Sequence, residues 1–205
     1  NHPRNVHVAF QIRIPNILAF REGVNASNEI SHIMKFVVIT GPESSGKTTL
    51  AKALSDRLGA PYIEEYARTY LRGLERPYDA DDLLAIARGQ VNSVRQVAIH
   101  SEKPYIICDT DLTVMKIWSE VKYGYCHPWI DKTLREAPAD LYLLCRPDIP
   151  WVYDPLREHP EDRPLLFDLY HTLLSSEQWP FVCIQGQQKQ VRIDQALRAI
   201  RAHCL

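Results

Sequence analysis

The sequence KFVVITGPESSGKTT occupies residues 35–49 and contains the phosphate-binding pattern G-x-x-x-x-G-K-[ST] between Gly41 and Thr48. The apolar run before the pattern predicts a buried strand over residues 35–40, and the residues after it, 48–58, have the spacing of an amphipathic helix. This order of strand, loop and helix is the context that the pattern requires, so a chance match of a glycine-containing turn is the weaker interpretation. The stretch therefore predicts a phosphate-binding loop within an α/β fold.

Each residue type in this loop has a physical role in holding a nucleotide. Glycines let the backbone turn tightly, so that successive N–H groups point at an anionic phosphate chain, and the new helix adds its positive end. We expect Lys47 to reach the β- and γ-phosphates of ATP and the Thr48 hydroxyl to bind Mg²⁺. The residues expected to bind the nucleotide are Gly41, Glu43, Ser44, Ser45, Gly46, Lys47, Thr48 and Thr49.

Short apolar runs alternate with helical patterns along the rest of the chain. Further strands are predicted at residues 61–64, 105–108, 140–145 and 181–184. Helices are predicted at 65–72, after a capping box of Asp79 and Asp82 with the stripe Leu83, Ala87, Val91, Val94 and Ala98, around Leu165, Leu166, Leu169 and Leu173, and around Ile193, Leu197 and Ile200. This alternation predicts a parallel sheet of five strands with helices on both faces.

Ligands of such sheets bind beyond the carboxyl ends of the strands. The phosphate loop, the carboxylates that follow the second and third strands, and the loop after Cys145 all follow strand ends. We therefore expect these segments to converge on one cleft.

The carboxylates of this cleft have different expected roles. Asp109 closes an apolar strand, where a ligand of nucleotide-bound Mg²⁺ is usual, although Asp109 or Asp111 could instead cap the helix that follows. Glu65 ends the second strand, where its carboxylate could take a proton from an attacking hydroxyl or orient it. Arg68, one helical turn later, either binds substrate or forms a surface ion pair with Glu64 or Glu65.

The loop at residues 146–163 is rich in proline, aromatic residues and arginine. In kinases of small molecules such a loop often closes over ATP and brings arginine to the transferring phosphoryl group. Arg157 and Arg163 are the candidates for that role, against the alternative that both belong to a solvated surface loop. Trp151 and Tyr153 are either packing residues or a stacking surface for a flat heterocycle.

Composition excludes several classes of function. The formal net charge is −1, so no electrostatic argument favours a nucleic-acid partner or an anionic membrane. No apolar run approaches the length that spans a membrane. Cys108, Cys145 and Cys183 each lie in a predicted buried strand, which is typical of small core residues in a reducing compartment. We therefore expect a cytoplasmic protein.

Residues 1–33 differ from the segment 34–205, which we expect to be the phosphate-loop domain. Apolar and polar residues alternate over 6–14, the period of a half-buried strand, and a loop follows. Met34 stands directly before the first strand of the domain. Residues 1–33 are thus either an upstream appendage or a genuine extension that pairs with a sheet edge or a partner chain.

From Met34 almost to the C-terminus the chain resembles the ribosylnicotinamide kinase domain of bacterial NadR proteins. The segments that carry the resemblance are 41–48 (GPESSGKT), 65–68 (EYAR), 89–90 (GQ), 109–111 (DTD), 127–128 (HP), 150–154 (PWVYD), 156–157 (LR) and 162–163 (DR). The phosphate loop is shared by a very large superfamily, whereas the Asp-Thr-Asp and Pro-Trp-Val-x-Asp-x-Leu-Arg signatures are far more specific. One departure is Glu64, at a position where family members carry an aromatic residue.

The resemblance implies a P-loop kinase fold and transfer of phosphate from ATP·Mg²⁺ to the 5′-hydroxyl of nicotinamide riboside, giving nicotinamide mononucleotide. The catalytic residues that follow from it are Lys47, Glu65, Asp109, Arg157 and Arg163, with Thr48 and Asp109 at the metal. The residues expected to bind the substrate are Glu65, Tyr66, Arg68, Asp111, Trp151 and Asp154. Adenine is expected beside residues 185–187.

Two other functions fit the phosphate loop. One is a kinase of another nucleoside or small alcohol, and the other is a regulatory switch that binds ATP or GTP to change its contacts with a partner. The eight histidines include no pair flanking a glycine in a nucleotide-binding turn, which would mark an adenylyltransferase. We therefore expect a stand-alone kinase that makes no dinucleotide and binds no operator DNA; the sequence predicts no oligomeric state.

Overall fold

The computed structural model describes residues 34–154 and 161–204. The strands within these ranges are β1 (Lys35–Thr40), β2 (Tyr62–Ile63), β3 (Tyr105–Asp109), β4 (Leu141–Cys145) and β5 (Phe181–Ile184). The helices are α1 (Lys47–Leu58), α2 (Tyr66–Arg72), α3 (Ala80–His100), α4 (Leu112–Tyr123), α5 (Pro128–Glu136), α6 (Arg163–Ser176) and α7 (Lys189–Cys204). The expected extension at residues 1–33 lies outside the described residues.

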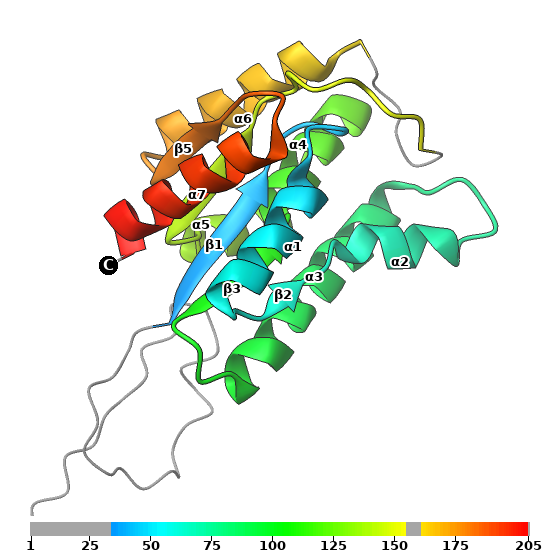
Figure 1. Cartoon of the computed structure of the whole chain (residues 1–205). Coiled ribbons are helices and arrows are strands. Elements are labelled where there is room, and N and C mark those ends of the chain that lie inside the picture. Colours follow the sequence, from blue (N-terminus) through cyan, green and yellow to red (C-terminus); the bar gives the residue numbers. More distant parts are fainter. Residues whose placement is uncertain (1–33, 155–160, 205) are drawn as a thin grey trace, which may run out of the picture.

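The five strands form one parallel sheet in the order β2-β3-β1-β4-β5 (Figure 1). The central strand β1 pairs with β3 on one side and β4 on the other, so Val37 lies opposite both Ile107 and Leu141. This arrangement confirms the predicted five-stranded parallel sheet. It also puts the carboxyl end of β1, from which the phosphate loop leaves, between the two halves of the sheet.

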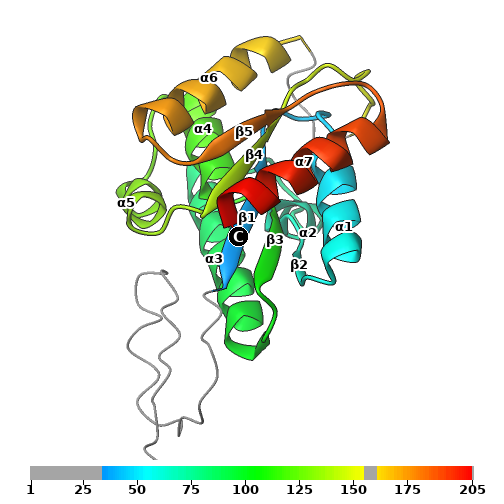
Figure 2. The same ribbon diagram turned by 60° about the vertical axis from the view of Figure 1, so that its left-hand side comes forward.

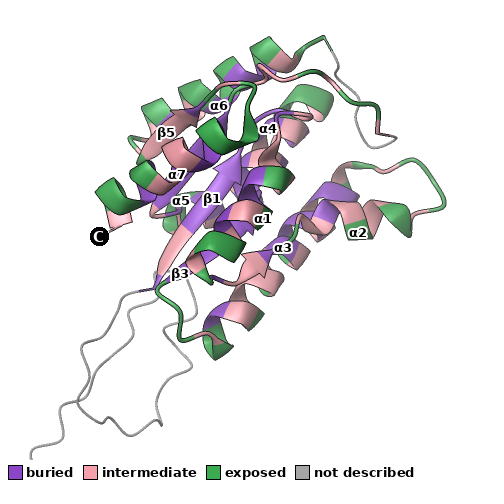
Figure 3. Ribbon diagram, in the orientation of Figure 1, coloured by how far each residue is buried: buried purple, intermediate pink, exposed green. Residues whose placement is uncertain are grey.

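Helices cover both faces of the sheet, as predicted (Figure 2). Val37 and Ile39 of β1 point to one face, where they pack under α1 and α7, and Val38 points to the other face, under α3, α4 and α6. Figure 3 shows the strands buried or partly buried, with the outward faces of the helices exposed; β3 and β4 are buried along their whole length, while β5 is mostly intermediate. A third apolar cluster joins α2, α3, α4 and α5 beside the sheet.

The start of α3 is fixed by the capping box that the sequence predicts. The Asp79 carboxylate accepts hydrogen bonds from the backbone N–H groups of Asp81 and Asp82 at 3.0 and 3.1 Å, and the Asp82 carboxylate accepts from the Asp79 N–H at 2.8 Å. Arg76 also donates to Asp82, and this bond holds the pKa of the Asp82 carboxyl well below its usual range. The predicted stripe of this helix faces inward, with Leu83, Ala87 and Ala98 buried.

The helix expected around Leu165 is present as α6. Its buried face carries Leu166, Phe167, Tyr170 and Leu174, while Leu165 and Leu169 are 62% and 39% exposed. The second strand differs from the prediction, because it is only Tyr62–Ile63 and thus shorter than expected.

The helix α5 was not predicted. It begins after His127, whose imidazole accepts a hydrogen bond from the Trp129 N–H, and has Pro128 as its first residue.

Among the described residues, no helix has both the length and the apolar composition needed to cross a membrane.

Candidate active site

The phosphate loop leaves β1 at a glycine that the packing requires. Gly41 has φ 129°, and a Cβ at this position would lie 2.7 Å from the Cys145 carbonyl oxygen of the neighbouring strand. Gly46 has φ 82° and precedes the first residue of α1. The loop between them is closed by the Ser45 hydroxyl, which donates to the Pro42 carbonyl at 2.7 Å. The backbone thus turns into α1 without side chains in its way, as a phosphate-binding loop requires.

A cavity of about 150 Å³ lies over this loop. Its lining brings the phosphate loop together with the start of α2 and with α4, and consists of Glu43, Ser44, Ser45, Gly46, Lys47, Thr48, Thr49, Glu65, Ala67, Arg68, Leu71 and Trp118. The structure therefore brings Glu65 and Arg68 to the phosphate loop, as expected for segments at the carboxyl ends of neighbouring strands.

A second cavity of about 110 Å³ shares Glu43, Lys47, Glu65 and Trp118 with the first. Its other walls are largely apolar and come from Gly41, Pro42, Val114, Ile117, Val121, Leu166 and Tyr170. The two cavities therefore meet at one lysine and two carboxylates, with a polar phosphate loop on one side and an apolar compartment on the other. Trp118 lines both cavities, although no motif in the sequence distinguished it from an ordinary packing residue.

Lys47, Glu65 and Glu43 are the charged groups at this junction. The Lys47 ammonium donates to the carbonyls of Gly41 and Pro42 at 2.9 and 2.7 Å. The Glu65 side chain is 17% exposed, and burial raises the pKa of its carboxyl; the charge of Asp109 adds to the rise, while Lys47 and Arg68 oppose it. A carboxylate with a raised pKa is suited to accept a proton near neutral pH.

Arg68 forms ion pairs on two sides. Its Nε donates to Glu65 Oε2 at 3.0 Å and its Nη1 to Asp154 Oδ2 at 3.0 Å. The ion pair expected with a neighbouring carboxylate is thus present, with Glu65, while Glu64 is exposed. Arg68 therefore links the start of α2 to the segment that follows β4.

Asp109 is 1% exposed at the end of β3. Its Oδ2 accepts a hydrogen bond from the Tyr62 hydroxyl at 3.1 Å, and its Oδ1 has no hydrogen-bond partner among the described residues. Burial and the charge of Asp109 raise the pKa of Tyr62, so the phenol remains a donor. An unpartnered buried carboxylate oxygen needs a cation or a donor, and carboxylate and hydroxyl oxygens are the ligands that Mg²⁺ prefers.

The N-cap of α4 is Asp111 and not Asp109. The Asp111 carboxylate accepts from the Thr113 N–H at 2.9 Å and from the Tyr142 hydroxyl at 3.2 Å, and burial raises its pKa. This settles the alternative for Asp109, which does not cap the helix. Asp111 itself lines a cavity between α3 and α5, separate from the two over the phosphate loop, so its expected contact with substrate stays a prediction.

The segment after β4 lies against the phosphate loop. The Trp151 indole donates to Glu43 Oε1 at 3.4 Å, and the Val152 N–H donates to the Ser44 hydroxyl at 3.0 Å. At the start of α6, Arg163 donates to the carbonyls of Ser44 and Ile149 at 3.3 and 3.1 Å. Trp151 and Arg163 are thus beside the loop, whereas Arg157 lies outside the described residues.

The contact between α2 and α3 explains why a glycine and a glutamine stand at residues 89–90. A Cβ on Gly89 would lie 2.1 Å from Cε1 of the Tyr66 ring, and the Gln90 Oε1 accepts a hydrogen bond from the Tyr66 N–H at 2.8 Å. The ring of Tyr66 therefore packs against α3 at Gly89, and the glutamine accepts from one of the N–H groups at the start of α2 that have no partner within the helix. These two contacts fix where α2 presents Glu65 and Arg68.

Similarity to known proteins extends over most of the chain. A protein-family model described as an AAA domain matches residues 36–191. The trifunctional NAD biosynthesis/regulator protein NadR of Escherichia coli (strain K12) is 28% identical over 174 residues, which cover 82% of this chain and 42% of that protein. The chain therefore spans less than half the length of this relative.

Two solved structures resemble the fold. A NadR protein in complex with NR has a TM-score of 0.70 at 23% identity, covering 85% of this chain and 53% of that chain. Deoxyadenosine kinase from M. mycoides with bound dCTP has a TM-score of 0.58 at 14% identity, covering 82% and 99%. The fold is accordingly that of the P-loop kinases.

The family match extends from β1 to α7. It therefore includes the phosphate loop, every strand of the sheet and the segments that line both cavities. Since this match covers well over half of the chain, the protein belongs to the AAA domain family.

Proposed function

We propose that this protein is a kinase that transfers the γ-phosphoryl group of ATP to the 5′-hydroxyl of nicotinamide riboside, forming nicotinamide mononucleotide for NAD salvage. The observation that carries the proposal is the pair of adjoining cavities that meet at Lys47 and Glu65, one over a phosphate loop and one with apolar walls. The similarity to a NAD biosynthesis protein, and to a NadR structure described as a complex with NR, supports nicotinamide riboside as the acceptor.

The phosphates of ATP bind to the N–H groups of residues 41–49 and to the start of α1. Lys47 neutralises charge that develops on the transferred phosphoryl group, which is the main contribution a protein makes to this reaction. Thr48 and Asp109 have the oxygen ligands to hold Mg²⁺, and the unpartnered Oδ1 of Asp109 fits such a role. Held by these residues, Mg²⁺ would supply positive charge against the charge of the phosphates.

The acceptor lies in the second cavity, with its 5′-hydroxyl at Glu65. Glu65 orients this hydroxyl and accepts its proton, with Asp109 as the alternative base. Arg68 holds Glu65 by the ion pair described above. Tyr66, Trp151, Asp154 and Asp111 remain the other expected contacts of the acceptor. Arg163 and Arg157, both in the loop at residues 146–163, neutralise charge on the transferred phosphoryl group.

A product analysis tests this proposal. Purified protein is incubated with ATP, Mg²⁺ and a panel of nucleosides that includes nicotinamide riboside. The products are then separated, identified and quantified by mass spectrometry. We expect nicotinamide mononucleotide and ADP in equal amounts, and no ADP without an acceptor. Phosphorylation of a different nucleoside would replace the substrate assignment, and acceptor-independent ATP hydrolysis would favour a nucleotide switch.

Lys47→Ala and Glu65→Gln serve as controls of the product analysis. Both should fold, since neither side chain belongs to the apolar core, and both should lower product formation by at least about a hundredfold. A contaminating kinase would leave the same activity in the two variant preparations as in the parent.

A further inference from the structure

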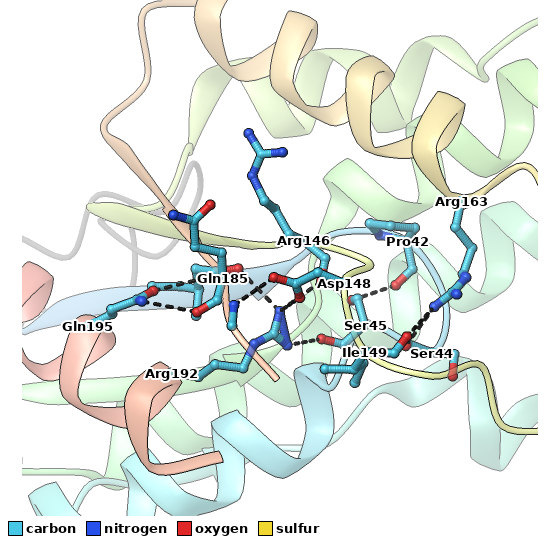
Figure 4. A network of polar contacts seen from close by, with 12 residues as sticks. Pro42, Ser44, Ser45, Arg146, Asp148, Ile149, Arg163, Gln185, Arg192 and Gln195 are labelled. Carbon is cyan, nitrogen blue, oxygen red and sulfur yellow. Dashed lines mark hydrogen bonds and ion pairs between the residues drawn. The ribbon is translucent and has the colours of Figure 1, made fainter. Parts of the chain in front are cut away.

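Arg192 contacts the phosphate loop and is not among the residues that line either cavity. It belongs to α7 and is 5% exposed, although arginine is rarely buried to this extent. Figure 4 shows its guanidinium surrounded by oxygen atoms. Burying a cation is costly unless it is well paired, because its charge is removed from water. Both terminal nitrogens of Arg192 are paired, while its Nε has no hydrogen-bond partner among the described residues. The partners of this residue therefore show what it is there to hold.

The guanidinium donates to three separate segments of the chain. Its Nη1 donates to the Ser45 carbonyl of the phosphate loop at 2.6 Å. Its Nη2 donates to the Ile184 carbonyl at the end of β5 at 3.2 Å, and to the Arg146 carbonyl and Asp148 Oδ1 after β4 at 2.7 and 3.0 Å. One planar group thus joins the carboxyl ends of β4 and β5 to the phosphate loop.

The bond to Ser45 has a direct consequence for the loop. A peptide unit is planar and trans, so its N–H points opposite to its C=O. The Ser45 carbonyl points at Arg192, and the N–H of Gly46 in the same peptide unit therefore points away from Arg192, toward the side on which phosphate binds. The Ile149 side chain and Arg192 Nη1 both lie just over 3 Å from where a Gly46 Cβ would be, so this peptide unit has little room to turn over.

The second consequence concerns the turn after β5. Asp148, which Arg192 holds through Oδ1, accepts a hydrogen bond from the Gly186 N–H through Oδ2 at 2.6 Å. Gln195 of α7 pairs with both backbone groups of Gln185, at 2.9 and 3.0 Å (Figure 4). The turn in which we expect adenine to rest is thereby connected through Asp148 and Arg192 to the loop in which we expect the phosphates.

We propose that Arg192 is a positioning residue for the nucleotide, setting the Ser45–Gly46 peptide for the phosphates and, through Asp148, the 184–186 turn for the base. The proposal deepens the proposed function and rests on it for the identity of the nucleotide. A lysine cannot replace the arginine, because a single ammonium lacks the planar fork that reaches three segments at once.

Binding measurements on purified variants test the proposal without relying on catalysis. ATP and tripolyphosphate are titrated by calorimetry against the parent and three variants: Arg192→Lys, Asp148→Asn and Arg198→Met. Arg198 is exposed on the same helix and serves as the matched control. Arg192→Lys keeps the positive charge, so this variant is chosen as one that folds. Thermal melting measures the stability of each protein.

We expect Arg192→Lys to weaken binding of both ATP and tripolyphosphate by about tenfold or more, the size expected for lost hydrogen bonds to a charged group. Asp148→Asn should weaken ATP binding but leave tripolyphosphate within about twofold, because the amide oxygen can still accept from Arg192 whereas the amide NH₂ cannot accept from the Gly186 N–H. KM for the acceptor should stay within about twofold in both, and Arg198→Met should match the parent throughout.

Equal ATP affinity in Arg192→Lys and the parent would overturn the proposal, as would parallel losses of ATP and acceptor affinity that follow the loss of thermal stability. Equal losses of ATP and tripolyphosphate affinity in Asp148→Asn would overturn the part that concerns the base. If the parent binds ATP but does not phosphorylate nicotinamide riboside, the proposed acceptor is wrong, while the binding results still decide the role of Arg192.

Discussion

At the scale of single residues, two carboxyl groups lie in unlike surroundings at the ends of paired strands. Glu65 follows β2 and is held by Arg68, while Asp109 ends β3 and is held by Tyr62. Burial favours the protonated form of Glu65, whereas the free oxygen of Asp109 favours a cation. Different environments of this kind separate an acid–base role from a metal-binding role.

The raised pKa of Glu65 leads to a pH prediction. If Glu65 accepts the proton of the acceptor, the rate falls as pH falls through its pKa, because the protonated carboxyl is inactive. The fall in kcat/KM for nicotinamide riboside should therefore occur above about pH 4.3, the ordinary value for glutamate. Arg68→Met should move it to higher pH, since Arg68 lowers the pKa of Glu65. An unchanged profile in Glu65→Gln would show that another group is the base.

Asp109→Asn tests the metal-binding role. The variant retains the shape of the side chain and loses the negative charge, so we expect the Mg²⁺ concentration for half-maximal activity to rise by about tenfold or more. Tyr62→Phe removes only the hydrogen bond to Oδ2 and should cause a smaller rise. Metal titration curves of Asp109→Asn and the parent that coincide would exclude Asp109 as a ligand.

At the scale of elements, the position of α2 depends on how closely it approaches α3. Gly89 leaves room for the Tyr66 ring, and Gln90 accepts the Tyr66 N–H. The same two helices contribute to the apolar cluster that also contains α4 and α5. Because α2 carries Arg68 and begins directly after Glu65, this contact sets the geometry of the site from outside it.

The effect of Gly89→Ala on the free energy of unfolding should change sign when Tyr66 is replaced. In the parent, the new methyl group would displace the ring, and we expect the free energy of unfolding to fall by about 1–3 kcal/mol. In a Tyr66→Ala background the same change should raise it by up to about 1 kcal/mol, because alanine favours helix over glycine. Urea denaturation measures both. The same sign in both backgrounds would mean that the close contact does not constrain α2.

At the scale of the whole molecule, nucleotide binding should stabilise the fold. ATP at about a hundred times its Kd contributes about 2.7 kcal/mol, which raises the melting temperature of a domain of this size by roughly 5–10 °C. Lys47→Ala should show a smaller rise on addition of ATP than the parent does, each measured from its own melting temperature without ATP. Scanning calorimetry with and without ATP decides this, and equal rises would remove Lys47 from nucleotide binding.

Much of this architecture could be predicted from local signals. β1 and β5 have the predicted bounds, because each is a short apolar run between clear breaks, and the Asp79 cap fixes the start of α3. The side chains that hold the site in place could not be predicted from local signals. Arg192 bonds mostly to backbone carbonyls of distant segments, and Tyr62 orients Asp109 across two strands. No residue pattern marks the contacts of Arg192, since any residue supplies a carbonyl, and the contact of Tyr62 with Asp109 depends on which strands pair.

The distance along the chain between Arg192 and the loop that it supports also has a consequence for synthesis. The two are separated by 147 residues. At 5–20 residues per second, a ribosome that has made the phosphate loop needs roughly 7–30 s to add the arginine that contacts it. During that interval the nascent chain has its glycine loop without the group that sets the Ser45–Gly46 peptide. We therefore expect the nascent chain to reach its full affinity for the nucleotide only after α7 has folded onto the sheet.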